Sequence, residues 1–474
     1  MLPDVNLLQD IIPLYNNLAR YKEHEGRLSA SLQVFPSPQI VWEFEVLGEE
    51  VKQKGSLNTG FPMSPLTGYQ FEIEKPVPTM DIHDIETPKE GLSGQALQAV
   101  LGDRNFKGHT FRFYLPNTRF QEINIFGQQQ IDQIHRVGEE ELGTEISGRL
   151  LESQLDNTWH VSLRTNKDAL DWLREQQPNI GSRITAVGIL HSAMGKDVKF
   201  TDYPTLSLDV AQEYIETLSV LLSFLNGGYT GPLYIEGHYY HSSNSESISE
   251  PGALVIIPRI TPIDLLGTSW CTYDSDLSAY LACFQTIKRM LSQSPWDESF
   301  GLILSWYFQA IQPEIMRGGK MWQVVANALG TALERLSYTI LVLEEENPTQ
   351  RENVELLFST NRGKANKVWE LKNISPSIKR LQMLLERIGI SLDRGFWDVN
   401  EVKNFVDVRN EATHPKKGIV DYRHIAHLLQ QATQWVYEVI LWRLGYNGNY
   451  LIKTTLGQHS IPHRYDLGTR NTDW

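Results

Sequence analysis

The chain is poor in cysteine and has no long apolar run. Its 474 residues include two cysteines, Cys271 and Cys283, which excludes a disulfide framework and a four-cysteine zinc site. Two thiols fit a reducing compartment, so we expect the protein in the cytoplasm. The apolar segments YTILVL (338–343) and LSVLLSFL (218–225) are far shorter than the roughly 20 residues that cross a bilayer. The N-terminal segment contains acidic residues and no apolar core of a signal peptide, so we expect no membrane partner.

Patterns for metal or cofactor chemistry are lacking as well. The segment GILHSAMGKD (188–197) ends in Gly-Lys but lacks the spacing and the following Ser or Thr of a phosphate-binding loop. Four histidines, His424, His427, His459 and His463, have no cysteine or carboxylate at ligand spacing. The sequence therefore predicts neither a metal ion nor a cofactor.

The charge is distributed unevenly along the chain. The net charge of −14 argues against nonspecific binding of nucleic acid by the whole surface. Residues 351–474 carry 18 Lys and Arg against 13 Asp and Glu, a balance of +5, which leaves −19 for residues 1–350. This asymmetry favours contact with nucleic acid at the C-terminal third, although an ordinary solvated surface gives the same balance.

The N-terminal part alternates apolar and polar residues with the period of a β-strand. QIVWEFEV (39–46) is the clearest case, and HTFRFYL, EINIFG, ISGRLLES and TWHVSLR are similar short runs separated by Gly, Pro and Asn. NKDALDWLREQ (166–176) interrupts them with the pattern of a short helix. Residues 1–205 are therefore predicted to form a β-rich domain of sandwich or barrel type.

The pattern becomes helical further along the chain. DVAQEYIETLSVLLSFLNGG (209–228) has helical spacing and stops at Asn226-Gly227-Gly228. YTGPLYIEG and GALVIIPRI predict strands, so residues 206–296 are predicted to form a mixed α/β connecting region. Residues 297–446 are almost entirely helical in pattern, with Ser375-Pro376 as the cap and first turn of one helix. Residues 447–474 form a Gly- and Asn-rich tail. The predicted fold class is a multidomain α+β chain, β-rich first and all-α afterwards.

One predicted helix, WDVNEVKNFVDVRNEATHP (397–415), carries an arginine on its apolar face. At 100° per residue Val402 and Phe405 lie on one side, and Arg409, seven residues after Val402, lies there too. Because burial of an unpaired guanidinium is costly, Arg409 should face a partner, an interface or a cleft. A structural salt bridge between two packed helices would also explain an arginine at this position.

The end of this helix resembles a known motif. Arg409-Asn410-Glu411-Ala412-Thr413-His414 is similar to the R-x4–6-H signature of the HEPN superfamily of metal-independent ribonucleases, in which a polar residue directly follows the arginine. The order of a β-rich region, LLSFLNGGYTGPLYIEG and a helical domain resembles the large Apea-like HEPN proteins of bacterial antiphage defence. The resemblance is carried by residues 297–446, whereas the first 200 residues share only the architecture.

The resemblance implies a metal-independent endoribonuclease that acts as a homodimer or higher homo-oligomer, with the motifs of two subunits lining one cleft. It implies tRNA or another structured RNA as substrate, a phage-derived trigger and a regulatory or sensing N-terminal domain. Members of the superfamily often carry an acidic residue on an early helix near this motif, which makes Glu334 a candidate. An exposed helix surface explains Glu334 equally well.

These residue types suit cleavage of RNA by its own 2′-hydroxyl. His414 titrates in the range needed for proton transfer, and Arg409 can hold phosphate oxygens bidentately. Asn410 can donate a further hydrogen bond, and Lys416 and Lys417 can contact the RNA backbone, although a solvated lysine pair is the simpler interpretation of these two. The alternative function is a noncatalytic dimerisation and binding module whose N-terminal domain senses a ligand or protein.

Overall fold

The computed structural model of the chain divides near residue 264 into two compact units. The structure describes residues 11–21, 24–34, 37–46, 64–65, 71–76, 92–118, 150–165, 183–192, 204–239, 252–262, 270–271, 277–312, 321–359, 362–371, 374–389, 399–413, 422–448 and 450.

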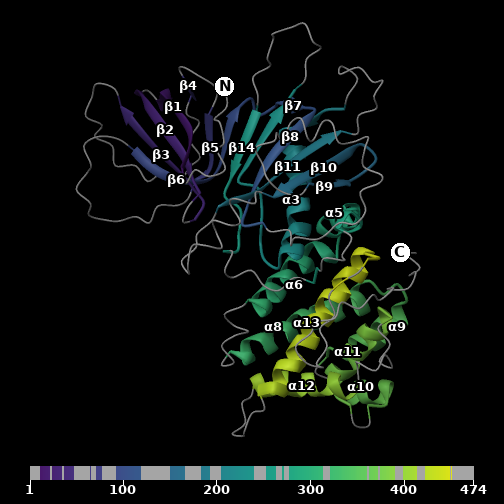
Figure 1. Ribbon diagram of the computed structural model, residues 1–474. Helices are drawn as coiled ribbons and strands as arrows, with labels where there is room; N and C mark the ends of the chain where they lie inside the picture. Colours follow the sequence, from purple (N-terminus) through teal and green to yellow (C-terminus); the bar gives the residue numbers. More distant parts are fainter. Residues whose placement is uncertain are drawn as a thin grey trace, which may run out of the picture. The chain divides into compact units, whose positions relative to one another are not determined.

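The N-terminal unit is built on one large antiparallel sheet (Figure 1). In chain order its elements are β1 (Ile11–Tyr21), β2 (His24–Gln33), β3 (Gln39–Val46), β4 (Ser64–Pro65), β5 (Phe71–Pro76), β6 (Leu92–Gly102), β7 (Lys107–Gly108), β8 (Thr110–Pro116), β9 (Leu150–Gln154), β10 (Trp159–Thr165), β11 (Ile184–Ser192), β12 (Leu206–Ser207), α3 (Leu208–Asn226), β13 (Tyr234–His238) and β14 (Gly252–Ile256). Across the sheet the order is β4-β1-β2-β3-β6-β14-β13-β8-β11-β10-β9, with β5 paired to β6, while β7 pairs with β12 separately.

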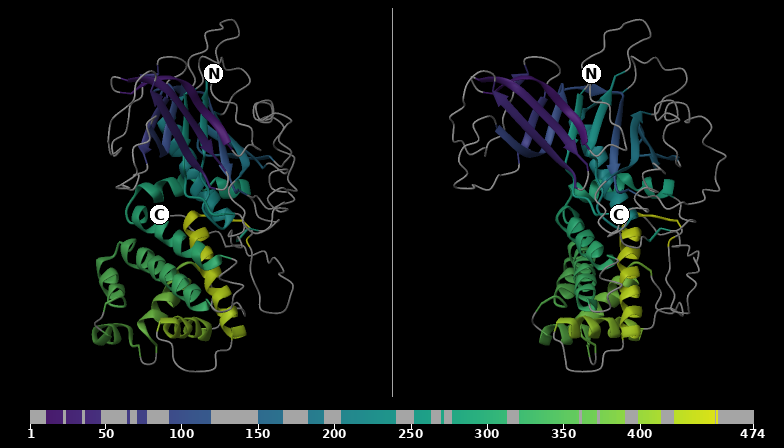
Figure 2. Two further views of the ribbon diagram at one scale, coloured as in Figure 1. Left: turned by 90° about the vertical axis from the view of Figure 1, so that its left-hand side faces the viewer. Right: turned by 60° about the vertical axis from the view of Figure 1, so that its left-hand side comes forward.

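Strand β6 joins the two halves of this sheet. Its residues 92–96 pair with β3 and its residues 98–102 pair with β14. Buried side chains of both halves share one hydrophobic cluster, in which Leu32 and Trp42 lie with Val187 and Tyr234. The sheet therefore bends so that its halves close over a common core, and β1–β3 (purple) run obliquely to the later strands (teal) in Figure 2.

Strands β13 and β14 lie in the middle of the sheet, between β8 and β6. The predicted connecting region 206–296 is thus shared between the units, because α3, β13 and β14 belong to the N-terminal unit. Helix α3 ends as its sequence predicts, at Gly227 with φ 73°. The predicted strand EINIFG and the predicted helix 166–176 lie outside the described residues.

A histidine is buried neutral in this sheet. His191 of β11 is 3% exposed, its Nε2 lies 3.2 Å from the hydroxyl of Ser162 on β10, and its ring stacks on His160. Burial lowers the pKa of His191 to about 4; the hydrogen bond to the Ser192 carbonyl opposes this shift and His160 adds to it. The unfolded chain takes up this proton near pH 6.5, so the folded state loses stability as the pH falls from about 6.5 to about 4.

We predict that His191→Gln removes this part of the pH dependence. From this group the wild type should lose about 2 kcal/mol of unfolding free energy between pH 7 and pH 5, and the variant should lose correspondingly less. Urea unfolding of the full chain at both pH values measures the difference, with His424→Gln, an exposed histidine of α13, as control. Equal pH dependence in wild type and His191→Gln would contradict the assignment.

The C-terminal unit is helical, so the α+β class predicted from the sequence is confirmed. Its described residues form nine α-helices and one π-helical turn: α4 (Leu277–Leu281), α5 (Phe284–Ser292), α6 (Trp296–Ile311), α8 (Trp322–Tyr338), η3 (Thr339–Leu343), α9 (Pro348–Glu355), α10 (Arg362–Trp369), α11 (Pro376–Arg387), α12 (Val399–Thr413) and α13 (Tyr422–Leu444). None of the helices in the described part of the chain is long and apolar enough to cross a membrane.

Helix α8 is the centre of this unit, because α6, α11, α12 and α13 all pack against it (Figure 1). The predicted start of α11 is confirmed: the Ser375 hydroxyl accepts a hydrogen bond from the Ile378 amide at 3.3 Å, and Pro376 follows. Helix α13 ends at Gly445, whose φ is 74°. Tyr450 then donates to the buried carboxylate of Glu438 at 3.0 Å, so the predicted tail begins with a contact to α13.

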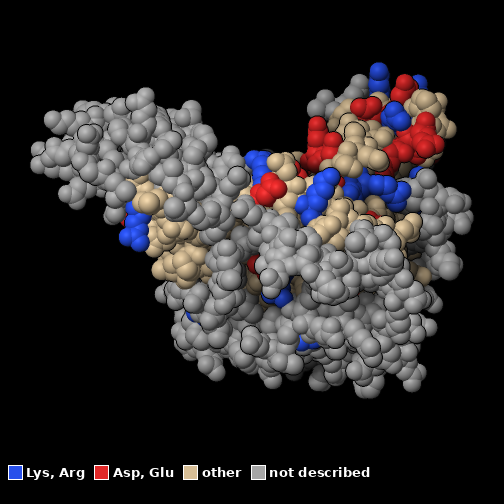
Figure 3. Space-filling view, turned by 90° about the horizontal axis from the view of Figure 1, so that it is seen from above, with Lys and Arg blue, Asp and Glu red and all other residues tan. Residues whose placement is uncertain are grey.

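The charged side chains of the described residues do not separate by sign on the face seen in Figure 3. Lysine and arginine (blue) lie next to aspartate and glutamate (red) there. Contact of RNA with the C-terminal third stays a prediction.

Candidate functional site

Helix α12 buries its apolar face and keeps Arg409 at the edge of that face. Val402, Phe405 and Val406 are buried, and the Phe405 ring meets Trp435 of α13 edge-on at 5.9 Å. The Arg409 side chain retains 33% of its exposure. The arginine is therefore neither a buried core residue nor a freely solvated one.

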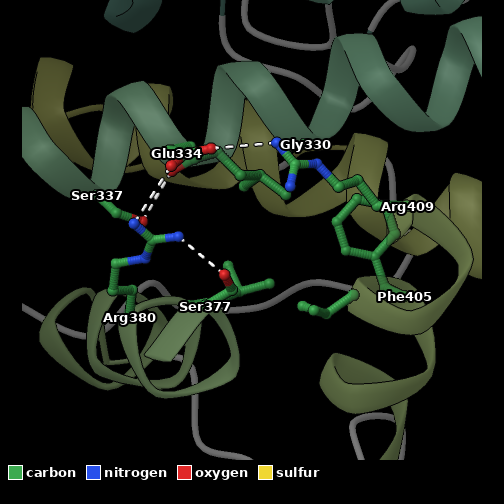
Figure 4. Close-up of a pocket in the computed structure, with 10 residues that line it drawn as sticks. Gly330, Glu334, Ser337, Ser377, Arg380, Phe405 and Arg409 are labelled. Atoms are coloured by element: carbon green, nitrogen blue, oxygen red, sulfur yellow. Dashed lines mark hydrogen bonds and ion pairs between the residues drawn. The ribbon is translucent and has the colours of Figure 1, made fainter. Parts of the chain in front are cut away.

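Glu334 of α8 is the partner of Arg409. Its Oε2 lies 3.3 Å from Nη2 of Arg409, and its Oε1 lies 3.2 Å from Nη1 of Arg380 on α11 (Figure 4). One carboxylate thus bridges two guanidinium groups and links three helices that are far apart in the sequence. The structure brings together two of the residues singled out from the sequence, Arg409 and Glu334, and adds Arg380.

Arg380 is held more tightly than Arg409. Its side chain is 11% exposed, it donates to the Ser377 hydroxyl at 2.9 Å, and its guanidinium carbon lies 4.4 Å from the centre of the Phe358 ring. Burial lowers the pKa of Arg380; Glu334 opposes this shift by attraction and Arg409 adds to it by repulsion. Arg380 is therefore a rigid anchor for the Glu334 carboxylate.

Gly330 makes room for Arg409 on α8. A Cβ atom added at Gly330 would lie 2.8 Å from Cγ and 3.2 Å from Nε of Arg409. Since real Cβ atoms almost never approach so closely, the arginine stem packs directly on the helix backbone only because residue 330 is glycine. Gly330 lies one turn before Glu334, so α8 supplies both the surface under Arg409 and its ion-pair partner.

These side chains enclose a pocket of about 40 Å³ between α8, α11 and α12 (Figure 4). Its walls combine apolar and polar groups, and the lining residues are Gly330, Leu333, Glu334, Ser337, Ser377, Arg380, Leu381, Phe405, Val406 and Arg409. The three charged residues sum to one positive charge, which suits an anion better than a cation.

The remaining predicted site residues lie at or beyond the end of α12. Asn410 is exposed, and Thr413, the last residue of the helix, donates a hydrogen bond to Asn327 of α8 at 3.0 Å. His414, Lys416 and Lys417 lie outside the described residues. Their membership of one site with Arg409 stays a prediction. Among the described residues, no three His, Cys, Asp or Glu side chains cluster as metal ligands.

Sequence reasoning missed Arg380, Ser377 and Gly330. Arg380 precedes the buried Leu384 by one helical turn and so lies at the edge of the apolar face of α11, which is the one local signal for it. Arg380 also contacts Phe358 and Glu334, which are distant in the sequence, so the sequence of α11 does not predict these contacts. Gly330 has no local signal beyond being a glycine inside a helix.

Comparison with known families bears on this helical region. Residues 293–462, from α6 past the end of α13, match the family model of the YopA C-terminal domain. This part of the chain, less than half of it, is therefore similar to that domain. Neither the curated proteins nor the solved structures gave a match.

A matched pair of glycine substitutions tests the packing of Arg409. A Cβ atom added at Gly301 of α6 would have no atom within 4 Å, so Gly301→Ala should stabilise the chain by about 0.5–1 kcal/mol through helix propensity. Gly330→Ala should not increase the unfolding free energy in this way, because Arg409 must move off α8 and away from Glu334. Urea unfolding of both variants measures the difference, and an equal gain in both would show that Arg409 is not held against α8.

Proposed function

We propose that the chain is a metal-independent endoribonuclease of HEPN type that cleaves tRNA or another structured RNA in antiphage defence. It acts in the cytoplasm as a homodimer or higher homo-oligomer. The N-terminal region restrains the helical region until a phage-derived signal is sensed, since an unrestrained ribonuclease would harm its host.

The state of Arg409 supports this proposal most directly. Within the described part of the chain, Glu334 is the one hydrogen-bond or ion-pair partner of its guanidinium, and it takes up only Nη2. A guanidinium carries five N–H donors, so Nε and Nη1 remain available to the oxygens of a ligand. The group is one-third exposed and lines a pocket of net positive charge, which are the properties needed to hold a phosphate.

The proposed reaction uses the substrate's own hydroxyl as nucleophile. The 2′-oxygen attacks the adjacent phosphorus while His414 accepts its proton. The bond from phosphorus to the next 5′-oxygen breaks, and that oxygen takes a proton from the second copy of His414 in the dimer. Arg409 stabilises the negative charge that builds on the phosphate oxygens, and Glu334 holds Arg409 in position. The products are a 2′,3′-cyclic phosphate and a 5′-hydroxyl.

A second candidate function follows from the same ion pair. Glu334 pairs with Arg409 within one chain, and such a pair is also what a purely structural arginine requires. In that case the helical region is a noncatalytic dimerisation and binding module, and the N-terminal region carries the function by sensing a ligand or protein.

We predict that the full chain cleaves RNA in EDTA and that His414→Ala abolishes turnover with little loss of RNA binding. Arg409→Ala should impair both, because it removes the contact with phosphate. The assay is cleavage of labelled tRNA with analysis of the ends. A folded His424→Ala variant controls for loss of a histidine on the neighbouring helix α13 and should cleave normally.

Two outcomes would exclude this mechanism. One is cleavage of a substrate with a 2′-O-methyl group at the scissile position, because that substrate lacks the nucleophile. The other is loss of cleavage in EDTA, which would require a metal site. Absence of cleavage in wild type and variants alike, with RNA still bound, would favour the noncatalytic module.

The charge balance gives a separate prediction for binding. The double variant Lys416→Glu, Lys417→Glu should bind RNA more weakly and lower the salt slope by about one unit per lysine that contacts a phosphate. The control is Lys364→Glu, Lys367→Glu, which makes the same charge change on exposed positions of α10. Equal losses in both variants, or crosslinks that map mainly to residues 1–200, would contradict the prediction.

A further inference from the structure

We propose that the pocket between α8, α11 and α12 is a binding site for one phosphate group, contacted by the guanidinium groups of both Arg409 and Arg380. The proposal rests on the proposed ribonuclease only for the identity of the ligand, which is then a phosphodiester of the RNA backbone. It adds Arg380 to the site and assigns the pocket itself.

The charges of the pocket leave room for an anion. Arg380 and Arg409 share the single carboxylate of Glu334, one oxygen each, at 3.2 and 3.3 Å. The other described residues that line the pocket are glycine, serine, leucine, valine and phenylalanine, so none of them compensates the second cation. One positive charge therefore remains on a half-enclosed surface.

The hydrogen-bond donors are arranged for the same ligand. Arg380 uses Nη1 on Glu334 and Nη2 on Ser377, and its flat face rests on Phe358, which together fix the plane of the guanidinium. Arg409 uses only Nη2. The shared carboxylate sets the distance between the two groups, so the remaining donors of both are placed before any ligand binds.

Burial of Arg380 favours an anionic ligand. It lowers the pKa of this arginine, which means that the surroundings stabilise its charge less well than water does. Repulsion from Arg409 acts in the same direction. An added phosphate would relieve both effects, whereas a cation or a neutral ligand would relieve neither.

The size of the pocket selects the kind of group that enters. Its volume is about 40 Å³, which is room for a group of a few atoms. Such a space admits the oxygens of a phosphate and is small for a nucleobase. The site therefore positions the backbone without reading the sequence, and selection of the RNA belongs to other surfaces.

The test uses inorganic phosphate and the full chain, without RNA. Phosphate should raise the melting temperature of the wild type relative to chloride at equal ionic strength, as any ligand of the folded state does. Arg380→Lys keeps the charge but not the planar fork, and we expect about tenfold weaker phosphate affinity from it. Arg443→Lys is the matched control, because Arg443 pairs with Glu344 at 2.8 Å outside the pocket; it should keep wild-type phosphate affinity.

If a variant melts at too low a temperature for this measurement, its phosphate affinity is measured instead from line broadening of the phosphate ³¹P resonance at low temperature. Arg380→Lys with wild-type affinity would overturn the role of Arg380. No phosphate-specific effect in the wild type would overturn the whole site. Neither result bears on whether the chain cleaves RNA in EDTA, which a separate assay measures. The phosphate site and the ribonuclease activity can therefore fail independently.

Discussion

The Glu334 carboxylate, shared by Arg380 and Arg409, is the interaction on which the pocket of the helical unit depends. A guanidinium that is 11% exposed needs a partner, because burial of an unpaired charge is costly. Glu334 meets this need for Arg380 and at the same time limits where Arg409 can lie. Three helices, α8, α11 and α12, are thereby fixed around one pocket.

This constraint has a consequence for function. A carboxylate that bridges two cations leaves a net positive charge and arginine donors fixed in place, so the cost of ordering two flexible side chains is met during folding. A phosphate that enters such a site gains charge-assisted hydrogen bonds without having to gather their donors. The same arrangement without a ligand is a stable salt-bridge cluster, which is why the structural and the ribonuclease interpretations share these residues.

The sequence predicted what depends on local patterns. Strand periodicity, the Ser375-Pro376 cap and the glycine stop of α3 follow from neighbouring residues, as does the position of Arg409 on an apolar face. The insertion of β13 and β14 into the N-terminal sheet could not be predicted, because the strands that flank this pair, β8 and β6, lie more than a hundred residues earlier in the chain. The role of Arg380 was missed for the same reason, since it depends on how α8 and α11 meet.

A double-mutant cycle between Glu334 and Arg409 measures whether Glu334 positions Arg409 for phosphate. The measurement is the affinity of the full chain for a non-cleavable 2′-O-methyl RNA in wild type, Glu334→Gln, Arg409→Met and the double variant. If Glu334 acts through Arg409, its substitution weakens binding in the wild type and weakens it less once Arg409 is gone, because only the part that acts through Arg380 then remains. The positioning role of Glu334 would be contradicted if the losses of binding free energy in the two single variants sum to the loss in the double variant within about 0.5 kcal/mol. Stronger binding by Glu334→Gln would contradict it as well.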